Sequence, residues 1–81
     1  PNPVRPEFQG EVKLSDLMEG AIVKITDTSG YLVYETTSLG GTVTWNTYNY
    51  NGNKVPSGVY LVFVTSKDGM EKTSRKLMII R

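Results

Sequence analysis

The chain contains 81 residues, with 9 lysines and arginines against 8 aspartates and glutamates, and it has neither histidine nor cysteine. Without these two residue types it forms no disulfide, no thiol nucleophile, no serine–histidine triad and none of the usual zinc sites. A net charge of +1 gives no general reason to bind nucleic acid or a membrane surface. We therefore expect one small domain with a single hydrophobic core. Its free energy of unfolding should lie toward the low end of roughly 5–15 kcal/mol.

Prolines dominate the opening segment, at Pro1, Pro3 and Pro6. Proline-rich segments commonly separate domains, and the chain does not begin with methionine. We expect residues 1–8 to be a linker or first edge strand, and residues 9–81 to form a single domain of a larger protein. No apolar run approaches the ~20 residues of a membrane-spanning helix, so no direct membrane span is expected.

Apolar and polar residues alternate with a period of two along most of the chain, which is the pattern of half-buried strands. The predicted strands are residues 11–15, 22–26, 31–37, 42–45, 58–66 and 72–80. With a first edge strand in the opening segment, there are about seven strands, separated by frequent turn residues. This pattern predicts an all-β, immunoglobulin-like β-sandwich of antiparallel strands, with a small barrel as the alternative.

Two turns predict how neighbouring strands pair. In Asp27–Gly30, the Asp27 carboxylate can accept backbone hydrogen bonds and Gly30 can take a positive φ, so a hairpin is expected there. Lys67–Gly69 favours a type I′ hairpin turn between the last two strands. The strand 58–66 is apolar on both faces and is therefore predicted to be central in its sheet.

The inward positions of the predicted strands define a candidate core of aliphatic and aromatic residues. Its members are Val23, Ile25, Val33, Val43, Trp45, Tyr60, Val62 and Val64. We expect Trp45 and Tyr60 to anchor this core, with residues 46–57 as the turn system that spaces them.

No group of residues indicates catalysis or a bound cofactor. The eight acidic residues are spread along the chain, so no pair is expected to converge as a general acid and base. Asp27–Gly30 offers one carboxylate and two hydroxyls, which is too few oxygen ligands for a calcium site. The glycines lie in turns rather than in a phosphate-binding loop before a helix. We therefore expect no enzyme activity, no metal and no cofactor.

A first candidate for binding is the loop that contains Tyr48, Asn49 and Tyr50. Aromatic rings and amides together can bind a glycan, because rings stack on sugar C–H faces and amides bond hydroxyls. The alternative, which we favour, is that the asparagines form turns and a tyrosine packs over the end of the sandwich. The loop carries a single cation, Lys54, which argues against a nucleic-acid partner.

A second candidate is the basic C-terminal segment, with Lys72, Arg75, Lys76 and Arg81. One interpretation is an edge strand whose charges discourage sheet-to-sheet aggregation, and the residues alone favour it. The functional interpretation is a docking strip for an acidic partner.

Motifs along nearly the whole chain carry a family resemblance. In chain order they are Asn2–Val4, Val23–Val33, Trp45, Asn49, Gly52, Val55, Ser57–Tyr60 and Lys76–Ile80. This order resembles the C-terminal sorting domain of type IX secretion cargo in Bacteroidetes. It is also similar to the immunoglobulin-like domain of the flagellar hook-capping protein. Those families often follow the tryptophan with Asp-Gly, where this chain has Asn46 and Thr47. This departure weakens the transfer of the loop's tight turn but not of the sandwich.

The resemblance implies a non-enzymatic terminal domain that is read by a secretion machine. The parent protein would cross the periplasm and reach the outer-membrane surface or the exterior. Residues 72–81 would be most needed for recognition, with strand addition to the backbone and with Lys72, Arg75 and Lys76 setting the orientation. One alternative is a passive accessory domain that packs on a neighbouring domain of a β-propeller sensor or two-component regulator. A second is a carbohydrate-binding module that uses Tyr48 and Tyr50.

Overall fold

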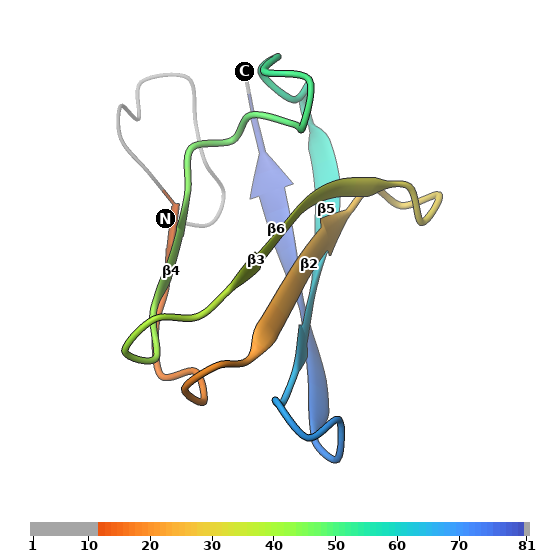
Figure 1. The fold of residues 1–81 in the computed structure, drawn as a ribbon. Coiled ribbons are helices and arrows are strands. Elements are labelled where there is room, and N and C mark those ends of the chain that lie inside the picture. Colours follow the sequence, from red (N-terminus) through yellow and green to blue (C-terminus); the bar gives the residue numbers. More distant parts are fainter. Residues whose placement is uncertain (1–11, 81) are drawn as a thin grey trace.

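The computed structural model describes residues 12–80, which form six strands and no helix (Figure 1). The strands are β1 (Val12–Leu14), β2 (Ile22–Thr26), β3 (Leu32–Thr37), β4 (Val43–Trp45), β5 (Gly58–Thr65) and β6 (Lys72–Ile79). The predicted all-β class is therefore confirmed, and this part of the chain contains no helix that could cross a membrane. The edge strand predicted within residues 1–8 lies outside the described residues.

The strands form two antiparallel sheets around one core. The larger sheet has the order β3-β2-β5-β6, and β1 pairs with β4 in a small second sheet. Figure 1 shows the short pair β1 and β4 beside the larger sheet. Since β5 lies between β2 and β6, its predicted central position is confirmed. The arrangement is consistent with the predicted immunoglobulin-like sandwich.

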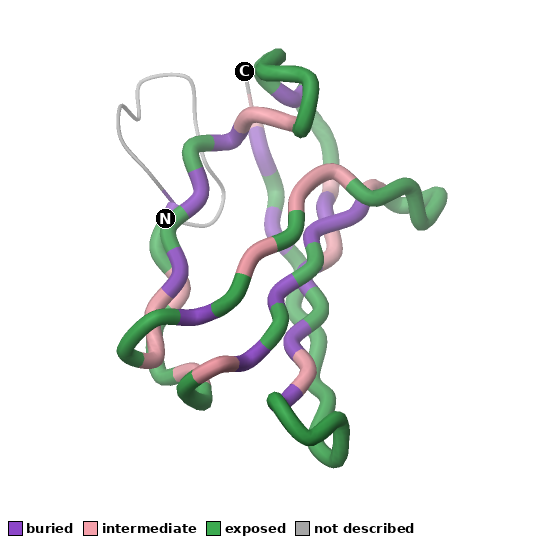
Figure 2. The backbone as a smooth tube through the Cα atoms, viewed as in Figure 1, coloured by how far each residue is buried: buried purple, intermediate pink, exposed green. Residues whose placement is uncertain are grey.

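Burial alternates along the strands and places the core between the two sheets (Figure 2). The buried apolar residues are Val12, Ala21, Val23, Ile25, Val43, Trp45, Val55, Tyr60, Val62, Val64, Leu77 and Ile79. Of the predicted core, only Val33 is missing from this set, because it is partly buried. The register between β2 and β3 shifts after Ile25, so that Ile25 pairs with Tyr34 and Thr26 pairs with Leu32. Tyr34 pairs with the buried Ile25 and therefore takes the inward position, so alternation turns Val33 to the outer side, where the register shift falls. Both side chains are partly buried against the core.

Trp45 is the centre of an aromatic cluster. The Tyr34 ring stacks on it with centroids 6.4 Å apart, and the Tyr60 ring meets it edge-on at 6.1 Å. The Trp45 indole N–H donates to the Tyr48 carbonyl at 2.9 Å, and the Tyr60 hydroxyl donates to the Pro56 carbonyl at 2.6 Å. Both rings therefore bury their apolar surface while their polar atoms stay bonded. The Tyr60 contact has the form of the tyrosine corner found in immunoglobulin-like sandwiches.

The hairpin between β2 and β3 closes as the sequence predicts. Oδ1 of Asp27 accepts hydrogen bonds from the backbone N–H groups of Ser29 at 2.8 Å and Tyr31 at 3.0 Å. Gly30 has a φ of 90°, in the left-handed region that glycine adopts without a Cβ clash.

The turn between β5 and β6 differs from the predicted type I′ form. That form needs a positive φ at both Lys67 and Asp68, but neither residue has one, and the positive φ of 77° falls on Gly69. The Gly69 N–H donates to the Ser66 carbonyl at 2.9 Å, which closes a type I turn followed by a left-handed glycine. The physical reason is that glycine takes this conformation without the steric cost that Lys67 or Asp68 would carry.

The end of the sandwich opposite the Trp45 loop is held together by Ser38, which the sequence did not single out. Ser38 is fully buried, and its hydroxyl donates to the Met18 carbonyl at 2.6 Å and accepts the Ala21 N–H at 3.2 Å. The Leu17 N–H donates to the Gly41 carbonyl at 3.0 Å. These bonds join the connection between β1 and β2 to the connection between β3 and β4.

Candidate functional site

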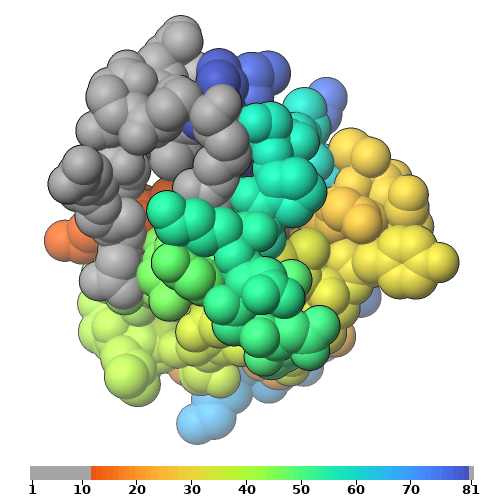
Figure 3. Space-filling model, turned by 90° about the horizontal axis from the view of Figure 1, so that it is seen from above, coloured from red at the N-terminus to blue at the C-terminus, as the bar shows by residue number. Residues whose placement is uncertain are grey.

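The predicted ligand loop lies at one end of the sandwich, beside the turn at residues 27–31 (Figure 3). Oδ1 of Asn49 accepts the backbone N–H groups of Asn51 at 2.9 Å and Asn53 at 3.0 Å, as Asp27 does in its own turn. The amide oxygen that could bond a sugar hydroxyl is therefore used to shape the loop.

The two tyrosines of this loop do not form one platform with Asn49. The Tyr50 ring lies against Tyr34, with centroids 6.1 Å apart, and Tyr48 is half-buried while its carbonyl accepts the Trp45 indole N–H. A hollow of about 360 Å³ nearby is lined by Asn49 but by neither tyrosine. The geometry favours the structural interpretation, in which Tyr50 extends the aromatic cluster over the end of the core.

The turn after the tryptophan is present although the chain lacks the Asp-Gly of related sequences. Oδ1 of Asn46 accepts the Tyr48 N–H at 2.9 Å, as an aspartate would. Thr47 has a φ of 68°, the left-handed conformation that a glycine would adopt with less strain. A tight turn therefore forms here without Asp-Gly, and the fold holds Thr47 in the strained conformation. The Thr47 carbonyl accepts the Val55 N–H at 2.9 Å.

The second candidate site, β6, is an edge of the four-stranded sheet. Among the described strands it pairs only with β5. Residues 72–76 are all exposed, whereas Leu77 and Ile79 reach the core. The first half of the strand therefore faces solvent, and the second half anchors it. Arg81 lies outside the described residues.

The sheet register separates the predicted basic residues between two faces. Arg75 pairs with Val62, whose side chain lies in the core, so Arg75 is on the side of the inner face. Because side chains alternate along a strand, Lys72 and Lys76 lie on the opposite, outer face. A partner that covers the outer face meets the two lysines without Arg75.

Two residues of the outer face were not among the predicted site residues. Lys24 of β2 pairs with Phe63 of β5, and Phe63 pairs with Ser74 of β6. Alternation in the sequence places Lys24 and Phe63 at outward positions of their own strands. It does not reveal that β2 and β6 flank β5, and this neighbourhood brings the two side chains close to the lysines of β6.

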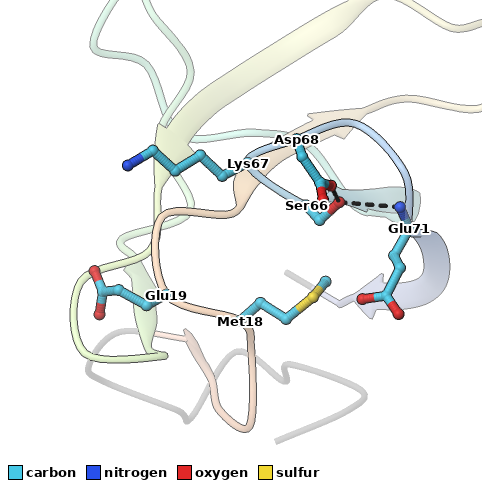
Figure 4. A pocket seen from close by; sticks show the side chains of 6 residues that line it. All are labelled: Met18, Glu19, Ser66, Lys67, Asp68 and Glu71. Atoms are coloured by element: carbon cyan, nitrogen blue, oxygen red, sulfur yellow. Dashed lines mark hydrogen bonds between the residues drawn. The ribbon is translucent and has the colours of Figure 1, made fainter.

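A hollow of about 540 Å³ lies between the β1–β2 connection and the β5–β6 turn (Figure 4). Three carboxylates line it, from Glu19, Asp68 and Glu71. Two of them are engaged separately, because Glu19 accepts the Gly40 N–H at 2.6 Å and Asp68 accepts the Ser66 hydroxyl at 2.6 Å. Within residues 12–80, no group of three or more acidic residues is arranged to hold a metal ion.

The Ser66 hydroxyl, and next the Met70 N–H, hold the pKa of Asp68 below its ordinary value of 3.8. A carboxyl whose pKa is lowered in the folded state stabilises the fold above its unfolded pKa, and this contribution is lost as the pH falls through the lowered value. We therefore expect the Tm of the wild type to fall more steeply below pH 3.8 than the Tm of Asp68→Asn. Thermal unfolding of both proteins between neutral and strongly acidic pH measures the difference. Parallel curves would contradict the assignment.

A family model of secretion system C-terminal sorting domains matches residues 1–80. The chain belongs to this family. The sorting domain is also similar to PorZ of Porphyromonas gingivalis, with 42% sequence identity and a TM-score of 0.90. The similarity covers 100% of this chain and 11% of the PorZ chain, which is described as an essential bacterial surface component of the type IX secretion system. The comparison with curated proteins finds no significant match.

Family membership confirms the resemblance drawn from the sequence motifs. Sorting domains of this family are signals for secretion on larger proteins, and the family is not catalytic. Membership therefore implies that this chain is a secretion-sorting signal on a larger protein.

Proposed function

We propose that this sorting domain directs its parent protein through the type IX system to the outer-membrane surface by presenting the first half of β6 to the secretion machinery. The observation that carries the proposal is that β6 is an edge strand whose residues 72–76 are all exposed. At residues 72–75 an edge strand can offer backbone groups for strand addition, which would supply affinity. Lys72 and Lys76 share a face and would orient an acidic partner, since charges across an interface steer encounter and set register.

A reporter fused ahead of residues 1–81 in a host with a type IX system tests this proposal. Deletion of residues 72–81 is a poor test, because it also removes Leu77 and Ile79 from the core. The double variant Lys72→Glu, Lys76→Glu reverses the charges at exposed positions instead. We expect it to reduce the reporter at the cell surface about tenfold, the effect of losing about 1.4 kcal/mol of binding.

The matched control is Lys54→Glu with Asn51→Glu and Asn53→Glu, which lowers the net charge by the same amount at exposed positions of the loop. We expect this control to be exported like the wild type. An equal loss of export in the β6 variant and in this control would assign the effect to net charge and would contradict recognition through β6.

A second candidate function is supported by the 42% identity to PorZ over the whole chain. In that case the domain belongs to a component of the secretion apparatus rather than to a cargo. Deletion of the domain from its parent protein separates the two roles. A cargo signal affects export of the parent alone, whereas a component of the apparatus affects export of unrelated cargo proteins as well.

A further inference from the structure

The outer face of the four-stranded sheet combines exposed apolar side chains with lysines. The register aligns its outward positions in four rows across the strands. In the order β3, β2, β5 and β6, the first row is Thr37, Ile22, Thr65 and Lys72, and the second is Glu35, Lys24, Phe63 and Ser74. The third row is Leu32, Thr26, Leu61 and Lys76, and the fourth has Val59 on β5 and Met78 on β6. We call these residues the outer sheet face.

The apolar part of this face runs along β5 and onto β6 and is open to solvent. Phe63 is 40% exposed and Met78 is 45% exposed, and the half-buried Leu61 and Val59 connect them. Ile22 and Leu32 are exposed as well, but Thr26 separates Leu32 from Leu61, and the direct neighbour of Ile22 on β5 is Thr65. Single exposed apolar residues are common on protein surfaces, but a contiguous group on one sheet face marks an interaction surface.

The charges of this face are distributed unevenly. Lys72 and Lys76 lie along β6, and Lys24 of β2 lies directly across from Phe63 in the same row. Glu35 is the single acidic residue of the face and lies on β3, directly across from Lys24. A complementary surface would therefore have an apolar centre and carboxylates opposite Lys72 and Lys76, while Lys24 adds positive charge beside Glu35.

We propose that the outer sheet face is a docking surface for a protein partner with an apolar centre and an acidic rim. This inference rests on the proposed function, since the partner would be part of the secretion machinery, and it adds Phe63 and Lys24 to the recognition site. Phe63 lies inside the face, with Lys24 and Ser74 across the strands and Leu61 two residues along its own strand. A central aromatic residue surrounded by polar groups is the usual arrangement of a binding hot spot.

An anionic membrane is the other kind of surface that a basic and apolar face could bind. Lipid-binding sites of this type commonly cluster four to eight lysines and arginines. The outer sheet face has three lysines, Lys24, Lys72 and Lys76, together with one carboxylate. The charge is therefore better suited to a protein partner.

The test uses the same reporter fusion with the variants Phe63→Ser and Lys24→Glu. Both residues lie on inner strands of the sheet, so recognition of the β6 edge alone would tolerate them. We expect each variant to lower surface display of the reporter about tenfold, as truncation of an interface hot spot does. The matched controls are Leu39→Ser, which truncates an apolar side chain that is 79% exposed, and Lys54→Glu in the loop. Both should be exported like the wild type.

The outcomes separate the two proposals. If the wild-type fusion is not exported, the proposed function fails. If Lys72→Glu, Lys76→Glu blocks export while Phe63→Ser and Lys24→Glu leave it unchanged, the outer sheet face is not the docking surface and the β6 edge stands. Thermal unfolding of each variant checks folding, and Lys24→Glu at its exposed position keeps the test decisive if Phe63→Ser is unstable. A further measurement is sedimentation of the wild-type protein with phosphatidylglycerol vesicles. If the protein sediments with them and Lys24→Glu abolishes this binding, the face binds lipid and the proposal of a protein partner is overturned.

Discussion

Replacement of Trp45 by alanine is expected to lower the free energy of unfolding by about 3–5 kcal/mol. The side chain is 1% exposed and contacts the rings of Tyr34 and Tyr60. Its indole N–H also bonds the Tyr48 carbonyl at 2.9 Å, so alanine would leave both a cavity and an unbonded carbonyl at the base of the loop. In a domain of this size such a loss removes most of the stability, since total values start at about 5 kcal/mol.

Urea denaturation measured by far-ultraviolet circular dichroism tests this prediction. Fluorescence would not serve for the variant, because Trp45 is the single tryptophan of the chain. Tyr31→Ala is the control, since that aromatic side chain is 74% exposed and its removal should change stability by no more than about 0.5 kcal/mol. A loss below about 1 kcal/mol for Trp45→Ala would show that the tryptophan does not anchor the core.

Replacement of Gly41 by alanine is expected to destabilise the fold by about 2–4 kcal/mol. A Cβ at this position would lie 2.8 Å from the Leu17 carbonyl oxygen, and the φ of 76° is strained for any residue other than glycine. The backbone would have to move, which would also weaken the bond from the Leu17 N–H to the Gly41 carbonyl. That bond is one of those that close this end of the sandwich.

Gly40 supplies the matched control, because it has a similar φ of 64° but no atom within 4 Å of an added Cβ. Gly40→Ala should therefore cost only the backbone strain, about 1–2 kcal/mol. The entropy that alanine removes from the unfolded chain is the same in both variants and cancels in the comparison. Equal losses for the two variants in chemical denaturation would contradict the role assigned to the contact with Leu17.

The two candidate sites differ in how the fold uses them. In the loop, Asn49 and Tyr50 are engaged by backbone N–H groups and by the Tyr34 ring. On β6, Lys72 and Lys76 are held at exposed outer positions by a strand that Leu77 and Ile79 anchor in the core. The loop therefore contributes to stability, and the strand is the better candidate for recognition.

Local sequence patterns predicted most of the fold, because they depend on neighbouring residues alone. Alternation located every described strand, and Asp27 and Gly30 predicted the first hairpin. The errors arose in the choice of the inward face of one strand and in the type of one turn. Tyr34 rather than Val33 takes the inward position opposite Ile25, and Gly69 rather than Lys67 takes the left-handed conformation.

The strand pattern, most of the core and the family follow from the amino-acid order, since hydrophobic period, turn residues and motif order are all local or linear properties. Which side chains share a surface depends on the folded sheet. Arg75 was separated from Lys72 and Lys76 by the pleat, and Lys24 and Phe63 joined those lysines because β5 lies between β2 and β6. The apolar pattern of residues 58–66 indicated a central strand, but alternation within single strands does not say which strands flank it.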